Sequence, residues 1–132
     1  SIFIFVKETK SNFSKNVFKK IFINIPKEVL HKKISARVEM MLNRGAVKEV
    51  KNFLKLKINK DLPSNKIIGM REIREYLEQN TSLSDVKELI KLRTRQYAKR
   101  QFTWARGHMK SWEMLYSSDL NDLYRKVINK IS

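Results

Sequence analysis

The spacing of apolar residues along the chain predicts a mostly helical protein. Apolar side chains recur at intervals of three and four over five stretches, as they do on one face of an amphipathic helix. These stretches are residues 27–44, 47–54, 73–77, 82–106 and 120–131. Residues 17–25 instead alternate and then run apolar, which is typical of a β-strand. A short apolar stretch at residues 112–116 precedes the last helix.

Residues at the expected helix ends agree with this pattern. Pro26 suits the first position of the first helix, and Gly45 suits the position just after its end. Ser82 and Asp85, three positions apart, resemble a capping box. The long helix is therefore expected to begin at Ser82 and to continue until Gly107 disfavours it.

Only one stretch of the chain is convincing as a strand. A lone strand leaves its backbone hydrogen-bonding groups unsatisfied, so it needs neighbours. We expect it to form the edge of a sheet whose other strands lie upstream, outside this chain. The expected fold class is mostly α with one or two remnant strands.

Composition and charge point to a folded protein with a polyanionic partner. The chain has 132 residues, the size of one domain, and 42% of them are apolar, enough to support a core. Lys and Arg number 29 against 13 Asp and Glu, which gives a net charge of +16. The isoelectric point of about 10.2 makes a nucleic acid the expected partner.

Several kinds of chemistry are excluded by residue types that the sequence lacks. Without cysteine there is no thiol chemistry, disulfide or cysteine zinc site. His31 and His108 each stand alone, so we interpret them as ordinary surface positions and expect no metal ligands. There is no phosphate-binding glycine loop, nucleophile–base set or acidic cluster for magnesium. No apolar run approaches the roughly 18 residues of a membrane span, which favours a soluble, cytoplasmic protein.

The most informative stretch is residues 94–106, which combine four cationic and three aromatic side chains. At about 100° per residue, four cations fall within roughly 60° of one another on a helix, and four other side chains lie opposite. The cations are Arg95, Lys99, Arg106 and Lys110, and the opposite face carries Tyr97, Gln101, Trp104 and Ala105. We interpret the first face as a nucleic-acid contact, although a solvated amphipathic helix shows the same pattern. On the opposite face, core packing is the preferred interpretation of Tyr97 and Trp104 over base stacking.

Two further positions have more than one reading. Gly69 lies between apolar and basic residues, where a glycine serves either a close backbone approach or a simple turn. Arg37 precedes Val38 in the first helix, and its spacing alone is that of a surface arginine. Residues 61–64 read as an ordinary turn.

A set of motifs resembles the bacterial tRNA dimethylallyltransferases in order and spacing. The motifs are residues 37–45 with Glu49 and Val50, residues 61–64, 67–72, 76–77 and 94–106. Together they span about residues 18–112, and the last, with Ala98 to Gln101 followed by Thr103 and Trp104, is the most specific.

This resemblance implies an activity and a fold. Enzymes of this family transfer a dimethylallyl group from dimethylallyl diphosphate to N6 of the adenosine 3′ of the anticodon, in tRNAs that read codons beginning with U. They depend on Mg²⁺, and their fold is a P-loop nucleotide-kinase-like α/β core with a helical insertion that grips the anticodon arm. The reacting base is flipped out, since the N6 amine of a stacked base is shielded. The present chain would be the carboxy-terminal part of such an enzyme.

The resemblance also implies two tRNA-contacting segments. Matched position by position, these comprise Lys66, Ile67, Ile68, Gly69, Met70 and Arg71, together with Lys99, Arg100, Gln101, Phe102, Thr103, Trp104, Ala105 and Arg106. Cations there would hold phosphates of the anticodon stem-loop, and Gly69 would allow close approach of the RNA backbone. Arg37 matches a recurrent family arginine, and a contact with the diphosphate is one option for its role. Met70 and Ala105 depart from the family pattern, which commonly has tyrosine and a bulky apolar residue there.

The domain organisation follows from the same resemblance. Residues 1–132 are expected to form a single unit, in which residues 1–25, including residues 2–5, are the remnant edge of the α/β core. Residues 26–132 would then be the helical tRNA-binding region. The phosphate-binding loop and the acidic general base belong to the family's amino-terminal half, so we expect them elsewhere in a longer enzyme or on a separate amino-terminal polypeptide. The alternatives are a stand-alone RNA-binding module, an inactive relic, or a DNA-binding helical domain.

Overall fold

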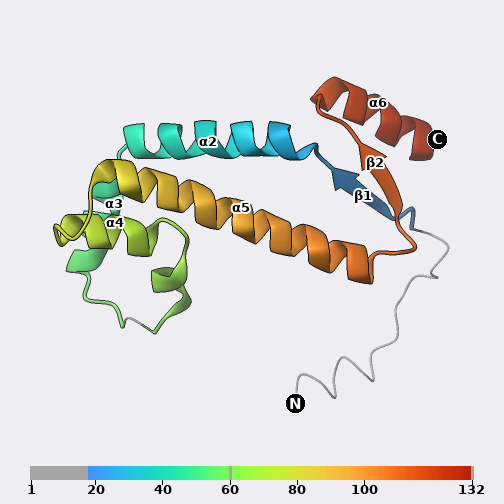
Figure 1. Cartoon of the computed structure of the whole chain (residues 1–132). Helices are drawn as coiled ribbons and strands as arrows, with labels where there is room; N and C mark the ends of the chain where they lie inside the picture. Colours follow the sequence, from blue (N-terminus) through green and yellow to red (C-terminus); the bar gives the residue numbers. More distant parts are fainter. Residues whose placement is uncertain (1–17, 60, 132) are drawn as a thin grey trace, which may run out of the picture. The chain divides into compact units, whose positions relative to one another are not determined.

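The computed structural model describes residues 18–59 and 61–131, which form two compact units (Figure 1). One unit contains residues 18–24 and 111–131, and the other contains residues 25–110. Residues 26–132 were expected to form one helical region, but residues 111–131 group with the first strand. The expected core remnant at residues 2–5 lies outside the described residues.

The smaller unit is built on two parallel strands. Strand β1 (Ile21–Asn24) pairs with β2 (Glu113–Tyr116), with Ile21 opposite Glu113 and Asn24 opposite Tyr116. The strand predicted at residues 17–25 is thus present, but within the described residues its neighbour comes from downstream. Strand β2 was not predicted, because a strand of four residues with only Leu115 buried is too short to show alternation.

Helix α6 (Leu120–Ile131) follows β2 after a polar turn. Ser117 is buried, and its hydroxyl donates to an Asp122 carboxylate oxygen at 2.7 Å. The apolar spacing of residues 120–131 predicts that Leu120, Leu123, Val127 and Ile131 face inward, but of these only Leu123 and Val127 are partly buried. Leu120 and Ile131 are 75% and 55% exposed, so that part of the prediction was wrong. Two strands of four residues cover only a short length of a twelve-residue helix.

Within residues 25–59 and 61–110, the larger unit contains four α-helices and one short 3₁₀ turn. They are α2 (Lys27–Asn43), α3 (Ala46–Lys55), η2 (Pro63–Lys66), α4 (Met70–Leu77) and α5 (Leu83–His108). Each α-helix lies at the position that the apolar spacing predicted. Residues 63–66, expected as part of a turn, form the 3₁₀ turn η2. Ser82 caps α5 as predicted, accepting a hydrogen bond from the Asp85 backbone N–H at 3.1 Å.

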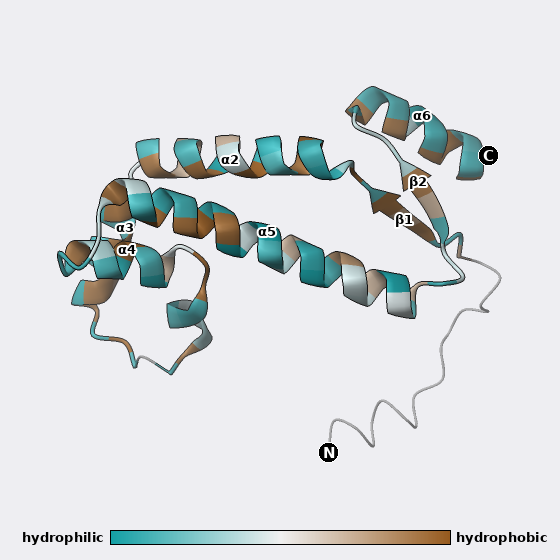
Figure 2. Cartoon of the chain, viewed as in Figure 1, coloured by the Kyte–Doolittle hydropathy of each residue, from teal (hydrophilic) through white to brown (hydrophobic). Residues whose placement is uncertain are grey.

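The core of this unit lies where α2, α3, α4 and the first half of α5 meet. Its buried side chains are Ile34, Val38, Ala46, Val50, Ile73, Val86 and Ile90. Helix α2 runs alongside α5 in the opposite direction (Figure 1). Figure 2 shows that hydrophobic residues gather in the first half of α5, whereas the second half is mostly hydrophilic. The second half of this helix therefore carries mainly polar side chains.

Candidate nucleic-acid interface

The two segments that were predicted to contact tRNA lie side by side in the helical unit. A hollow of about 420 Å³ is lined by the turn before α4, by α4 itself and by α5. Its lining residues are Asn65, Lys66, Ile67, Ile68, Arg71, Glu72, Arg93, Gln96 and Arg100. Residues that are far apart in sequence thus place three arginines and a lysine around one hollow.

A second hollow, of about 490 Å³, continues along α5. It is lined by Gln96, Lys99, Arg100, Thr103 and Trp104, at helical intervals of three and four. The two hollows share Gln96 and Arg100. We refer to them together as the cationic groove, which combines exposed cations, neutral hydrogen-bonding groups and one indole.

Glu72 holds the two sides of the cationic groove together. It lies in the first turn of α4 and is only 1% exposed. One carboxylate oxygen accepts a hydrogen bond from the Gly69 backbone N–H at 2.8 Å, and the other forms an ion pair with Arg93 of α5. A buried carboxylate requires such partners, because unpaired burial of a charge is very unfavourable. Glu72 therefore fixes the turn before α4 against α5.

Gly69 adopts a backbone conformation that other residues avoid. Its φ is +101° and its ψ is −33°, just before the first residue of α4. A β-carbon at this position would meet only Met41 Cε at 3.8 Å and Ile90 Cδ1 at 3.9 Å, which are ordinary contacts. Gly69 is itself buried. Of the two readings left open, the turn conformation is therefore sufficient to explain this glycine.

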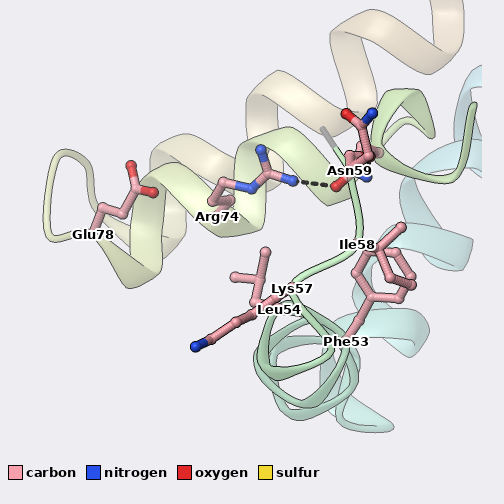
Figure 3. A pocket seen from close by; sticks show the side chains of 8 residues that line it. Phe53, Leu54, Lys57, Ile58, Asn59, Arg74 and Glu78 are labelled. Carbon is pink, nitrogen blue, oxygen red and sulfur yellow. Dashed lines mark hydrogen bonds between the residues drawn. The ribbon is translucent and has the colours of Figure 1, made fainter. Parts of the chain in front are cut away.

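The loop that carries Lys66 is fixed by side-chain amides. Asn65 is 8% exposed, accepts from Arg74 Nη2 at 2.6 Å and donates to the Asn59 carbonyl at 2.9 Å. A third hollow, of about 500 Å³, lies beside this loop (Figure 3). It is lined by Phe53, Leu54, Lys57, Ile58, Asn59, Asn65, Arg74 and Glu78. These bonds hold the start of the first predicted RNA segment in place.

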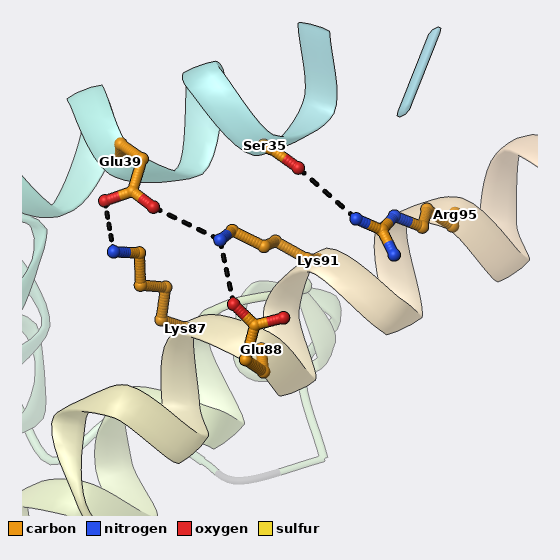
Figure 4. A network of polar contacts seen from close by, with 6 residues as sticks. All are labelled: Ser35, Glu39, Lys87, Glu88, Lys91 and Arg95. Atoms are coloured by element: carbon orange, nitrogen blue, oxygen red, sulfur yellow. Dashed lines mark hydrogen bonds and ion pairs between the residues drawn. The ribbon is translucent and has the colours of Figure 1, made fainter. Parts of the chain in front are cut away.

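Arg95 does not belong to the open cationic face that the helical wheel predicted. Its guanidinium donates from Nη2 to Ser35 Oγ on α2 at 3.3 Å (Figure 4). Its Nε is buried without a hydrogen-bond partner among the described residues. Lys99, Arg106 and Lys110 are exposed, as predicted. Arg95 thus contributes to the contact between α2 and α5, while the other three cations remain available to solvent.

Tyr97 and Trp104 were predicted to pack in the core, and this prediction was wrong. They are 50% and 56% exposed. The Arg100 guanidinium lies 5.9 Å from the centre of the Tyr97 ring, and the Trp104 ring stacks on His108. The helical wheel assumed one packed face along the whole helix. In the structure three of the four buried α5 residues lie in its first part, and only Ala105 is buried beyond them.

A network of ion pairs joins α2 to α5 ahead of the cationic groove (Figure 4). Lys91 is 8% exposed and contacts Glu39 at 3.1 Å and Glu88 at 2.8 Å, while Lys87 also pairs with Glu39. Hydrogen bonds from Lys87 and then Lys91 hold the pKa of Glu39 below its ordinary value. The Glu88 hydrogen bond raises the pKa of Lys91. Both lysines therefore form ion pairs with acidic side chains of the same chain.

The remaining predicted site residues differ in exposure. Ile67 is 60% exposed, whereas Ile68 and Met70 are partly buried against the core. Gln101 is exposed, Phe102 is partly buried beneath the Arg106 guanidinium, and Thr103 donates to the Lys99 carbonyl at 3.0 Å. Arg37 is exposed on α2. Side chains of both exposed and buried kinds thus occur in each segment.

Four residues of the cationic groove were missed by sequence reasoning. They are Asn65, Glu72, Arg93 and Gln96. Two of them carried a local signal: Glu72 stands three positions after Gly69, where a capping-box carboxylate is expected, and Gln96 lies one helical turn before Arg100. Asn65 and Arg93 become groove residues only through the packing of α4 and its preceding turn on α5.

The described residues offer no set of metal ligands. Within residues 18–59 and 61–131, no three His, Cys, Asp or Glu side chains cluster in a way that could hold a metal ion. Over the same ranges, none of the helices has the length and apolar character needed to cross a membrane.

Comparison with known proteins decides the family. The IPP transferase family model matches residues 4–108, which include both sides of the cationic groove. This chain belongs to the IPP transferase family. It is 49% identical over 112 residues to the tRNA dimethylallyltransferase of Pelagibacter ubique and 37% identical over 114 residues to that of Bartonella quintana.

Solved structures of IPP transferases share the fold. The tRNA isopentenylpyrophosphate transferase of Bacillus halodurans is 28% identical, with a TM-score of 0.75 over 96% of this chain. The enzyme from Staphylococcus epidermidis is 31% identical, with a TM-score of 0.69 over 86% of this chain. The chain spans 41% and 38% of these two structures, and 36% of the Pelagibacter relative. The mostly helical fold with two strands is therefore that of part of a family enzyme.

Proposed function

We propose that this chain supplies the tRNA-binding face of a tRNA dimethylallyltransferase. The reaction is transfer of a dimethylallyl group from dimethylallyl diphosphate to N6 of the adenosine 3′ of the anticodon, in tRNAs that read codons beginning with U. One observation carries the proposal: Lys66 and Arg71 from one predicted segment, and Arg100 from the other, line the same hollow. The names of the relatives support the same activity.

The cationic groove suits the anticodon stem-loop because it offers charges at fixed positions. Lys and Arg side chains neutralise phosphates, and such contacts set the position of the RNA without reading its sequence. Arg is further suited to bidentate phosphate contacts. Since the N6 amine of a flipped adenosine must reach the reaction centre, a rigid grip on the stem-loop contributes through orientation.

The reaction centre itself is assigned to other parts of the enzyme. We assign the Mg²⁺ that the family resemblance implies to those parts as well. Dimethylallyl diphosphate would be held mainly by the amino-terminal half, in the same polypeptide or a separate one. The exposed Arg37 is the candidate in this chain for a contact with the diphosphate. A cytoplasmic location belongs to the same proposal, because tRNA is the substrate.

Binding of a fluorescent anticodon stem-loop to the chain tests the proposal. Replacing Lys99 and Arg100 together by alanine should weaken binding about tenfold at physiological salt and reduce the slope of log K against log salt by about one per cation. The matched control replaces the exposed lysines Lys48 and Lys51 of α3. It should change the affinity by no more than about twofold, because loss of a distant charge acts only through the screened field.

Two results would contradict the proposal. If the groove and control variants lose RNA affinity equally, the RNA binds through the overall charge of the chain and not in the groove. Rapid prenyl transfer from labelled dimethylallyl diphosphate by this chain alone would show that the reaction centre lies within it.

A further inference from the structure

We propose that Trp104, supported by His108, is a stacking platform for one unpaired base of the bound RNA. The inference rests on the proposed function and adds to it a specific contact. The cations of the groove bind phosphates, whereas this indole stacks on a base. The ligand is therefore a nucleotide in a single-stranded loop, whose base has a free face.

The geometry of Trp104 is that of a fixed but open ring. Its centre lies 4.5 Å from the centre of the His108 ring, and the two planes are inclined by only 14°. His108 Nδ1 lies 2.8 Å from the Trp104 carbonyl oxygen, so the imidazole is itself tied to the last turn of α5. With its ring stacked against His108, Trp104 is still 56% exposed. A large exposed apolar surface held in a defined orientation is typical of a binding contact.

The surroundings of Trp104 favour a nucleotide over an apolar protein segment. The hollow beside the indole is lined by Lys99 and Arg100, which have no carboxylate partner among the described residues. The other lining side chains, Gln96 and Thr103, are polar and exposed. A cation and a flat aromatic ring in one hollow match the two parts of a nucleotide, its phosphate and its base. In a chain with a net charge of +16, a polyanion is the complementary ligand.

Fluorescence of Trp104 provides a direct test. The chain has two tryptophans, so the variant Trp112→Phe leaves Trp104 as the single reporter. Stacking of a base on the indole should quench this fluorescence when an anticodon stem-loop is added. A series of stem-loops, each with one abasic loop position, should retain binding while one member fails to quench, which identifies the stacked nucleotide. A blunt RNA duplex of equal charge should bind without comparable quenching.

Affinity measurements separate stacking from charge. Trp104→Ala should weaken stem-loop binding about tenfold, because the stacking of a base on the aromatic ring is lost. It should leave the salt slope unchanged, because no cation is removed. Trp104→Phe should recover most of the loss. Circular dichroism of both variants shows whether α5 is intact.

The outcomes distinguish this inference from the proposed function. Suppose that the Lys99 and Arg100 double variant weakens stem-loop binding but Trp104→Ala does not. Base stacking on Trp104 is then refuted, whereas RNA binding in the cationic groove is supported. If Trp104→Ala weakens duplex and stem-loop equally, or no abasic position alters the quenching, the indole does not stack on a base. If neither variant affects RNA binding, both proposals fail.

Discussion

At the scale of single residues, Glu72 is the most constrained side chain of the groove. It carries a buried negative charge in a chain with a net charge of +16, and both of its carboxylate oxygens have partners. Hydrogen bonds to charged groups stabilise a fold more than neutral ones do. Loss of this one carboxylate would release the turn before α4 and leave Arg93 without its partner.

Replacing Glu72 by glutamine should lower the free energy of unfolding by about 1.5–3 kcal/mol, the range for hydrogen bonds to charged groups. Glu75→Gln, on the same helix, is the matched control. Glu75 pairs with Arg71 at 2.9 Å, but the Arg71 side chain is 68% exposed, so the expected loss is only about 0.3–0.5 kcal/mol. Denaturant unfolding measures both variants. If both variants lower the free energy of unfolding equally, the buried Glu72 carboxylate contributes no more to stability than the exposed Glu75 carboxylate.

Replacing Gly69 or Gly107 by alanine should change the stability of the chain in opposite directions. Gly69→Ala should destabilise the chain by about 1–3 kcal/mol, because an L-residue is strained at φ +101°. Gly107→Ala should stabilise it by about 0.5–1 kcal/mol, since Gly107 lies in helix α5 with open space around it. Thermal unfolding of the two variants gives the comparison. A stabilising Gly69→Ala would mean that the turn relaxes without strain.

At the scale of elements, the contact between α2 and α5 depends on ionised carboxylates. The pKa values of Glu39 and Glu88 are held below their ordinary value of 4.5, chiefly by hydrogen bonds from Lys87 and Lys91 respectively. A carboxyl whose pKa is lower in the folded state stabilises the fold above its unfolded pKa. That stabilisation is lost as the pH falls below about 4.5 and through the folded pKa.

The variant Glu39→Gln and the unmodified chain should therefore have the same melting temperature in acid. At pH 7 its melting temperature should be lower, and the two curves should converge as the pH falls below about 4.5 and through the lowered folded-state pKa of Glu39, because the carboxyl group then becomes protonated in the folded state as well. Melting followed by circular dichroism measures this. Glu49→Gln, an exposed position on α3, is the control and should show no such convergence. A constant difference at all pH values would exclude an ionic role for Glu39.

Most helices could be predicted from the sequence, but the elements against which they pack could not. Periodicity and capping residues located α2 and α5 because these signals are local. Strand β2, the exposure of Trp104 and the contact of Arg95 with Ser35 depend on which elements pack together, and a single helix does not contain that information. The same applies to the site: most of its cations and its motifs were predicted, whereas Asn65 and Arg93 join it only through the contact of α4 and its preceding turn with α5.

At the scale of the whole molecule, the net charge of +16 opposes folding through self-repulsion. The described ion pairs involve only some of the basic residues, and groove cations such as Lys99 and Arg100 have no acidic partner among the described residues. A bound polyanion would relieve this repulsion. The free chain and its RNA complex should therefore respond to salt in opposite ways.

Raising the salt from about 0.01 M to about 0.5 M should increase the melting temperature of the free chain by several degrees, because screening shortens the range of repulsion. With a saturating anticodon stem-loop at low salt, the melting temperature should be higher than that of the free chain and should fall as salt weakens binding. Scanning calorimetry with and without the RNA tests both trends. A free chain that melts lower as salt rises would show that attractive ion pairs outweigh repulsion.

The parallel pairing of β1 with β2 has a consequence for the order in which the chain folds. Ile21 meets Glu113 only after the entire helical unit between them has been spanned, and closing so long a loop has an entropic cost of about 4 kcal/mol on logarithmic scaling. The contacts of the helical unit are closer in sequence and can form earlier. Nucleation is therefore expected among the helices, with the strand ladder forming last and opening first.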